Sequence, residues 1–216
     1  MPELSFRVEG AEALELAAVP TVVFKLGIEE RSGVSVRSLS LTTQVRITAN
    51  QRPYSVEEQQ RLVGVFGQPS GWLTALNSLL WTETTSVVPP FVGGAVVELK
   101  VPCTYDFEVV SARYFHALQD GVAPLEFLFS GSVFYAGQTG LQVERISWQN
   151  EAYFSLPVGV WKQAVQYAFP NSAWLRLPRD SFDRLASFRG RYALPTWEAA
   201  IDMLLAHAAR EELVSS

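Results

Sequence analysis

The chain has 216 residues and a mass of 24.0 kDa, enough for one domain, or two small ones, with a substantial core. Its net charge of -5 and its pI of about 5.1 argue against binding to nucleic acid or to an anionic membrane surface. Charged residues make up only 18% of the chain, while thirteen Phe and six Trp make it aromatic, so apolar surface is left for a partner unless a large core absorbs it.

A single cysteine, Cys103, excludes an intramolecular disulfide and is typical of a protein from a reducing compartment. The first residues, Met1-Pro2-Glu3, lack the basic region and apolar run of a signal peptide. No stretch approaches the ~20 apolar residues that span a bilayer. We therefore expect a soluble cytoplasmic protein that does not insert into a membrane.

Strand patterns fill the first 49 residues. Apolar residues alternate with polar ones over residues 4–8 and again over residues 22–28, which is the period of a strand with one exposed face. In a third run, residues 34–49, the apolar positions change parity near Arg37-Ser38. A bulge or bend there is needed to keep both halves of the strand facing the core.

The next segment combines one helix with irregular chain. Ser55 and Glu58 form a capping box, in which each side chain satisfies a free backbone amide, so a helix is predicted to begin at Ser55. Gly67, followed by further Gly and Pro, ends this helix. Residues 68–93 are punctuated by paired prolines and paired glycines, and we interpret them as a strand flanked by loops.

Strands dominate the centre of the chain. Residues 97–103 and 125–135 alternate as strands, and the second of these carries apolar residues on both faces. Residues 109–118 are compatible with a short helix or with the end of a strand. Residues 137–140 are typical of a hairpin turn, from which residues 141–148 return beside the preceding strand.

Helices are predicted for the C-terminal part. Apolar residues at steps of three or four predict a helix over residues 158–168 that Pro170 ends. Pro178 opens a second helix, and Pro195-Thr196 caps a third. The apolar faces of the last two helices are formed by Phe182, Leu185 and Phe188, and by Trp197, Ile201, Leu204, Leu205 and Ala208.

This order predicts an α+β fold, with one or more antiparallel β-sheets and C-terminal helices packed on one side. We expect a single domain, residues 1–216. Its segments are N-terminal strands (1–49), a helix and loop insertion (50–93), central strands (94–155) and C-terminal helices (156–210).

Recognisable chemistry is scarce. The sequence has no nucleophile elbow, phosphate-binding loop, dinucleotide fingerprint or zinc motif. His116 and His207 lie in different elements without further metal ligands at suitable spacing. Cys103 falls on the inward face of a strand, where a thiol is inert, and Asp180 and Asp183 lie beside arginines, as on a solvated helix face. We predict no catalytic site, no metal and no cofactor.

The aromatic residues supply the candidate binding sites. Trp72 and Trp81 lie in the least regular segment and Phe91 follows two prolines, so we expect these three side chains to be exposed and to contact a polypeptide partner. In the alternative interpretation, Trp148 and Tyr153, or the segment carrying the first three, line an apolar pocket for a small molecule.

Three stretches carry a resemblance over nearly the whole chain: PELSFRVEGAE near the start, FPNSAWLRLPRDSFDRL, and LPTWEAAIDMLL. They resemble an uncharacterised family of actinobacterial proteins whose genes often lie near those for high-affinity nickel-iron hydrogenases. The resemblance implies a non-enzymatic accessory role in assembling or maturing that enzyme, with a hydrogenase subunit as the protein partner. It implies no catalytic residue.

A second resemblance concerns the fold. The order of elements is similar to the last part of the export chaperone SecB, and it is carried by Gly131-Ser132-Val133-Phe134, Leu156-Pro157, Phe169-Pro170, Leu175, Leu177-Pro178 and Phe182-Asp183-x-Leu185. The resemblance implies a SecB-like core, association into homo-oligomers and chaperone-like binding of non-native polypeptide. The chain departs from it by adding residues 50–93 and a last helix with Trp197, so no binding residue is carried over.

Overall fold

The structure, a computed structural model, describes residues 2–72, 78–103, 109–137, 140–147, 149–172 and 176–214. These residues fall into two compact units, Met1–Trp174 and Leu175–Ser216. The predicted C-terminal segment, residues 156–210, is therefore shared between the two units. Antiparallel sheets and α-helices confirm the predicted α+β fold.

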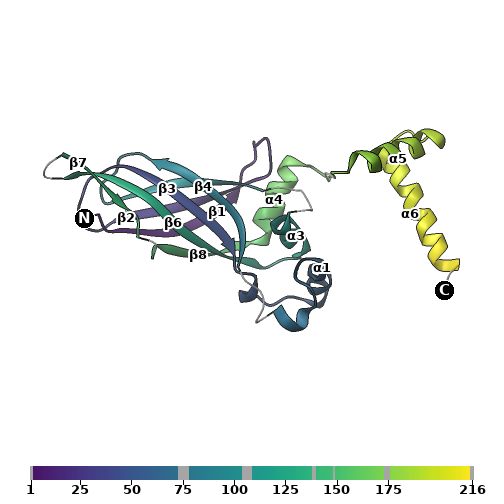
Figure 1. The fold of residues 1–216 in the computed structure, drawn as a ribbon, viewed down its shortest axis with the longest axis horizontal. Coiled ribbons are helices and arrows are strands. Elements are labelled where there is room, and N and C mark those ends of the chain that lie inside the picture. The colour runs from purple at the N-terminus through teal and green to yellow at the C-terminus, as the bar shows by residue number, and fades with distance from the viewer. Residues whose placement is uncertain are drawn as a thin grey trace. The chain divides into compact units, whose positions relative to one another are not determined.

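Two antiparallel sheets form the body of the first unit (Figure 1). The first sheet has the strand order β1-β2-β5, from β1 (Leu4–Ala13), β2 (Thr21–Glu30) and β5 (Gly94–Pro102). The second has the order β4-β3-β6-β7, with β8 also paired to β6, from β3 (Val36–Ile47), β4 (Leu79–Val88), β6 (Val122–Gly137), β7 (Gly140–Arg145) and β8 (Glu151–Pro157).

Aromatic contacts between the sheets mark the core. Phe24 of β2 is fully buried and packs edge-on against Phe127 of β6, with ring centroids 5.2 Å apart. Phe6 of β1 stacks on Phe129 of β6 at 4.4 Å. Because each pair joins one sheet to the other, the inward positions of the alternating strands meet in one apolar layer, as the period-two pattern predicts.

The predicted irregularity in the third strand is confirmed. The pairing of β3 with β6 shifts register between Val36 and Ser38, at the point where the parity of the apolar residues changes. The shift turns the strand so that Val36, Leu39 and Leu41 are all fully buried. A strict two-residue alternation would instead have placed Leu39 and Leu41 on the face opposite to Val36.

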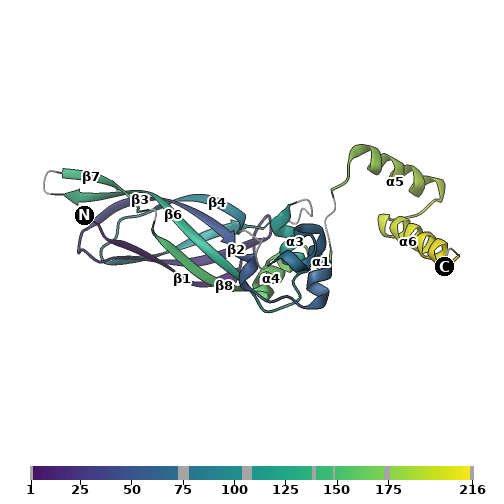
Figure 2. The same cartoon turned by 60° about the horizontal axis from the view of Figure 1, so that its bottom comes forward.

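Three helices gather at one end of the strands in both Figure 1 and Figure 2. They are α1 (Val56–Phe66), α3 (Val110–Ala117) and α4 (Val158–Ala168). The capping box of Ser55 and Glu58 opens α1, and Gly67 ends it with a φ of 73°, as predicted. Residues 109–118, compatible from sequence with helix or strand, contain the helix α3. Short 3-10 helices cover Ala49–Gln51 and Pro69–Gly71.

Some boundaries differ from the prediction. The sequence places the return strand at residues 141–148 and the next helix at 158, and it misses β8 between them. In the structure, the return strand β7 ends at Arg145. The strand β8 follows it and pairs with β6 from Val122↔Pro157 to Leu128↔Glu151. The predicted strand within residues 68–93 is present as β4.

The second unit contains two helices, α5 (Arg179–Arg191) and α6 (Trp197–Val214). Pro178 precedes α5, and Thr196 caps α6 by accepting a hydrogen bond from the backbone N–H of Ala199 at 3.2 Å. Both helices begin where the sequence predicts.

Gly131 is a site where any side chain should destabilise the sandwich. Its φ is +133°, and a Cβ atom there would lie 2.0 Å from the carbonyl oxygen of Ser40 in β3. We expect Gly131→Ala to lower the free energy of unfolding by at least about 2 kcal/mol. Gly159→Ala in α4, with no described atom within 4 Å, should leave it unchanged or raise it by up to about 1 kcal/mol. Urea denaturation measures both, and equal midpoints would contradict this reading of Gly131.

Candidate functional site

The second unit carries an open apolar groove of about 790 Å³. This α5–α6 groove is lined by Leu177, Ser181, Asp183, Arg184, Leu185, Ser187, Phe188, Arg191 and Leu204. Three of its four apolar residues, Leu177, Leu185 and Phe188, come from α5 and the residues just before it, and Leu204 comes from α6. The spacing of three residues between Leu185 and Phe188 places them on one face of α5, as predicted.

Apolar side chains around the groove are left uncovered within the unit. No residue of α5 is buried, and Ala200 alone is buried among the α6 side chains that the structure describes. Phe182 and Leu204 expose 42% and 41% of their surface, and Leu205 exposes 63%. Apolar stripes at helical spacing normally face a core. Here part of each stripe stays accessible to water within the unit.

The polar residues of α5 lie beside this surface. Arg179 forms an exposed ion pair with Asp183 at 3.3 Å, which confirms the solvated helix face predicted there. Arg189 lies over the ring of Trp197 at 4.1 Å and so links α5 to α6 by a cation–π contact. Arg184 and Arg191 are left as the cationic residues at the groove itself.

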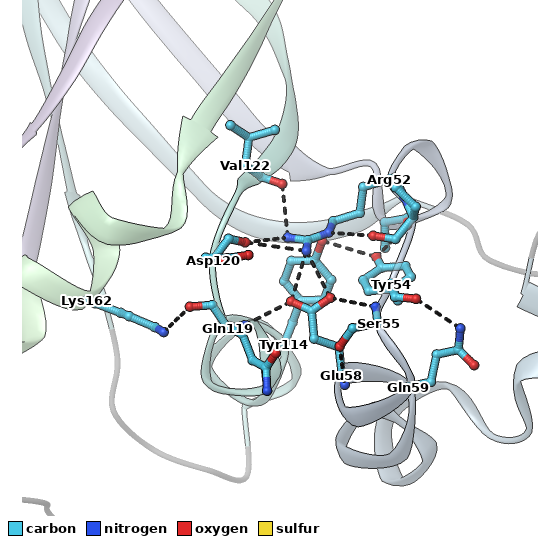
Figure 3. A network of polar contacts seen from close by, with 12 residues as sticks. Arg52, Tyr54, Ser55, Glu58, Gln59, Tyr114, Gln119, Asp120, Val122 and Lys162 are labelled. Atoms are coloured by element: carbon cyan, nitrogen blue, oxygen red, sulfur yellow. Dashed lines mark hydrogen bonds and ion pairs between the residues drawn. The ribbon is translucent and has the colours of Figure 1, made fainter.

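A buried ion pair occupies the helical end of the first unit (Figure 3). The Arg52 guanidinium donates to both carboxylate oxygens of Glu58, at 2.9 and 3.0 Å, and to the carbonyl oxygens of Asp120 and Val122. The Arg52 and Glu58 side chains are only 10% and 4% exposed. Glu58 also accepts the backbone N–H of Ser55. The pair therefore ties the start of α1 to the connection between α3 and β6.

Two tyrosines adjoin this pair. The Tyr54 hydroxyl donates to the carbonyl oxygen of Ala49 at 2.5 Å and lies 3.2 Å from the hydroxyl of Tyr114. Burial raises the pKa of both phenols, so both are protonated at neutral pH. A hollow of about 280 Å³ beside Tyr54 also contacts Trp72. Because the guanidinium and the carboxylate are saturated with partners, this network can fix structure but offers no free acid or base.

A third hollow, of about 460 Å³, lies against α4. It is lined by His116, Trp161, Lys162, Val165, Gln166, Phe169, Asn171 and Ser172. The His116 ring meets Trp161 edge-on, with centroids 4.8 Å apart. Burial lowers the pKa of His116, and the positive charge of Lys162 lowers it further, so the imidazole is neutral at neutral pH. We call this the His116 hollow.

The model of a family of unknown function, DUF6084, matches residues 1–213. This chain belongs to that family. No curated protein matches the DUF6084 chain.

Solved structures give distant likenesses to the DUF6084 chain. The CARDB domain of a Pyrococcus furiosus protein, in complex with di-metal ions, is 13% identical over 72% of this chain and 87% of its own, with a TM-score of 0.28. A putative late embryogenesis abundant protein is 12% identical over 73% and 72%, with a TM-score of 0.32. Beta-glucosidase 3B from Thermotoga neapolitana is 14% identical over 71% and 17%, with a TM-score of 0.27. At these scores none carries an argument about function.

The predicted exposure of Trp72 is wrong. Its side chain is 6% exposed, and the indole N–H donates to the carbonyl oxygen of Gly67 at 3.1 Å. The ring fills the space between Tyr54 and Phe66, with centroids 5.5 and 5.4 Å away. The irregular sequence around Trp72 concealed this packing, because no periodic pattern marks an inward position there.

Trp81 and Phe91 are half-buried and pack against the core. Trp81 lies on β4 and contacts the ring of Phe115 at 4.7 Å. Phe91 forms an isolated β-bridge with Val36. The structure does not bring the three predicted aromatic residues together as one exposed surface. Their contact with a polypeptide partner stays a prediction.

Two residues, Trp148 and Tyr153, were predicted to line an apolar pocket. Trp148 lies outside the described residues. Tyr153 is 57% exposed on β8, and its hydroxyl donates to the carboxylates of Glu126 and Glu151. Tyr153 lines none of the three hollows described above.

Cys103 is buried, as predicted, with 2% of its surface exposed. Burial raises the pKa of its thiol to about 12, so the nucleophilic thiolate is scarcely populated near neutral pH. Among the described residues, no three His, Cys, Asp or Glu side chains lie close enough to hold a metal ion. None of the described helices is long and apolar enough to cross a membrane.

The buried ion pair should contribute strongly to stability. We expect Arg52→Met to lower the free energy of unfolding by about 3–5 kcal/mol, because Glu58 would be left buried without its cation. Lys25→Met is the matched control, since it breaks the exposed Lys25–Glu12 pair of the same unit. Denaturant unfolding of both variants provides the measurement. A control that loses as much stability as Arg52→Met would show that burial of the pair is unimportant.

Proposed function

We propose that this DUF6084 chain is a non-enzymatic, chaperone-like accessory protein that binds a polypeptide partner in the α5–α6 groove. The observation that carries this proposal is the open groove of the second unit, in which the half-buried Leu185 and Phe188 lie beside the exposed Leu204. Water-exposed apolar side chains gathered on one face gain free energy when a partner covers them.

The groove suits an amphipathic helix. Its walls are themselves helices, and a helix docked between them would insert apolar residues at steps of three and four into the spaces around Phe188 and Leu204. Arg184 and Arg191 add positive charge at the groove. The preferred partner segment is therefore a helix with an apolar stripe flanked by acidic residues.

The identity of the partner is taken from the sequence resemblance. The family that the sequence resembles is often encoded near nickel-iron hydrogenase genes, and on that resemblance we propose a hydrogenase subunit as the first partner to test. A role in assembly or maturation fits a protein whose buried groups are chemically quiet. The Cys103 thiol is protonated and the Glu58 carboxylate is saturated by Arg52.

The alternative function, binding of a small molecule, is favoured by the His116 hollow. Its volume of about 460 Å³ falls within the range of about 300–1,000 Å³ typical of ligand pockets. Apolar residues, Trp161, Val165 and Phe169, share its wall with the polar groups of His116 and Asn171. The hollow beside Tyr54, at about 280 Å³, is just below that range.

Removing the apolar floor of the groove should abolish binding to polypeptide. We expect Phe188→Asp to lose suppression of the aggregation of reduced insulin, followed by light scattering, and to lose co-purification with the hydrogenase subunits. Val143→Asp on β7 is the matched control, because Val143 is 58% exposed in the first unit. Circular dichroism checks that the helices persist.

The proposal fails if the wild-type protein neither suppresses aggregation nor co-purifies with a native partner. It also fails if Phe188→Asp and Val143→Asp behave alike. Leu204→Asp repeats the test from α6, so that misfolding of α5 alone cannot account for a loss.

The small-molecule alternative has its own test. If the His116 hollow holds a ligand, native mass spectrometry of protein from its host should show a retained small molecule, and Val165→Trp should remove it by filling the space. Val143→Trp, an equal increase in bulk on β7, should retain it. A wild-type protein whose mass equals that of the bare chain would count against this function.

A further inference from the structure

We propose that, in the free protein, the α5–α6 groove is occupied by α6 of a second copy of this chain. Two copies then close a symmetric four-helix bundle, which masks the groove until a polypeptide partner displaces it. This inference rests on the proposed function, because it concerns the regulation of the same surface.

The apolar residues require such a cover. A hairpin of two helices can bury only the strip along its single contact, and here Ile201, Leu204 and Leu205 of α6 stay 41–63% exposed. A four-helix bundle encloses an apolar face from every helix. With 18 residues, α6 is long enough to lie along the whole of α5, which has 13.

The net charges of α5 and α6 favour a second copy of the chain as the occupant of the groove. In sequence, α5 carries four arginines and two aspartates, a net charge of +2. In contrast, α6 carries four acidic residues and one arginine, a net charge of -3 with His207 neutral. An acid-flanked helix with an apolar stripe is the segment that the groove prefers, and the chain contains one in α6.

The individual groups at the surface are free to make this pairing. Across the described ranges of the chain, Arg184 and Arg191 of α5 and Asp202 of α6 have no ion-pair partner within one copy. Placing α6 of one copy against α5 of the other brings opposite charges together. Pairing α5 with α5, or α6 with α6, would instead bring like charges together.

Two-fold symmetry doubles the number of favourable contacts between the two copies. In an isologous dimer each contact occurs twice, so the pairing of α5 with the second copy's α6 is matched by the reciprocal pairing. A foreign helix would fill one groove and leave Ile201 and Leu205 of α6, which do not line the groove, uncovered. A second copy covers both surfaces at once, which is why we favour it as the occupant in the free protein.

Light scattering coupled to size-exclusion chromatography tests the inference on the full chain. At about 100 µM protein we expect a mass twice the 24.0 kDa of one chain, and Leu204→Asp should give a monomer. Arg184→Glu and Asp202→Arg should each raise the dimer dissociation constant by about tenfold or more, and the double variant should restore it. Arg145→Glu, a charge reversal on β7, should leave the dimer unchanged.

A monomeric wild-type protein at this concentration overturns the inference, as does a dimer that Leu204→Asp leaves intact. Failure of the double variant to restore dimerisation overturns the pairing of α5 with α6. Because Asp202→Arg disrupts the dimer without changing a residue that lines the groove, it should suppress insulin aggregation better than the wild type. A decrease would contradict masking.

The same assays separate this inference from the proposed function. A monomeric wild type whose suppression of aggregation depends on Phe188 overturns the dimer alone. A dimer that follows the charge-reversal pattern, but whose monomeric groove variants suppress aggregation undiminished, overturns the proposed function alone.

Discussion

The buried ion pair between Arg52 and Glu58 is the constraint on which the helical end of the first unit depends. One guanidinium holds the first turn of α1, the connection after α3 and the start of β6. Removing two charges from water is costly, and here the cost is offset because every donor of Arg52 has an acceptor and Glu58 also receives backbone amides. The ion pair thereby fixes α1 beside α3, and Phe66 at the end of α1 packs against the buried Trp72.

The two units differ in how their apolar residues are buried. In the first, aromatic residues of facing sheets meet one another, and buried titratable groups are ion-paired, as Glu58 is, hydrogen-bonded, as Glu30 is, or held neutral, as Cys103 is. In the second, no described residue of α5 is buried, and Phe182, Ile201, Leu204 and Leu205 remain exposed to water. Apolar side chains on α5 and α6 would lose their contact with water if a partner covered them, which is the basis of the proposed binding at these two helices.

Local signals in the sequence were sufficient for much of the fold. The Ser55–Glu58 box and Gly67 define α1, because capping depends on residues a few positions apart, and the change of parity at Arg37-Ser38 located the bulge of β3. The strand β8 was missed because its seven residues lie between a predicted return strand and a predicted helix, although Ala152, Phe154 and Leu156 alternate with exposed residues. The role of Arg52 was also out of reach, since its acceptors at Asp120 and Val122 are almost seventy positions away.

The candidate site was foreseen in part. The apolar faces of α5 and α6 were predicted, but the exposure of Phe182, Leu204 and Leu205 on them was not, because periodicity shows that a helix has an apolar face and not what covers it. Trp72 illustrates the opposite error, in which an irregular context suggested exposure and long-range packing produced burial.

The strand β6 is paired along both of its edges. One of its edges pairs with β3, and the other is divided between β8 up to Leu128 and β7 from Ser132. Between these two pairings, the N–H of Phe129 donates to the carbonyl oxygen of Asn150, and the N–H of Ile146 donates to the carbonyl oxygen of Gly131. These two hydrogen bonds continue the pairing along this edge of β6. An extended segment of another protein therefore finds no open backbone ladder at this junction, and recognition by added strands is blocked there.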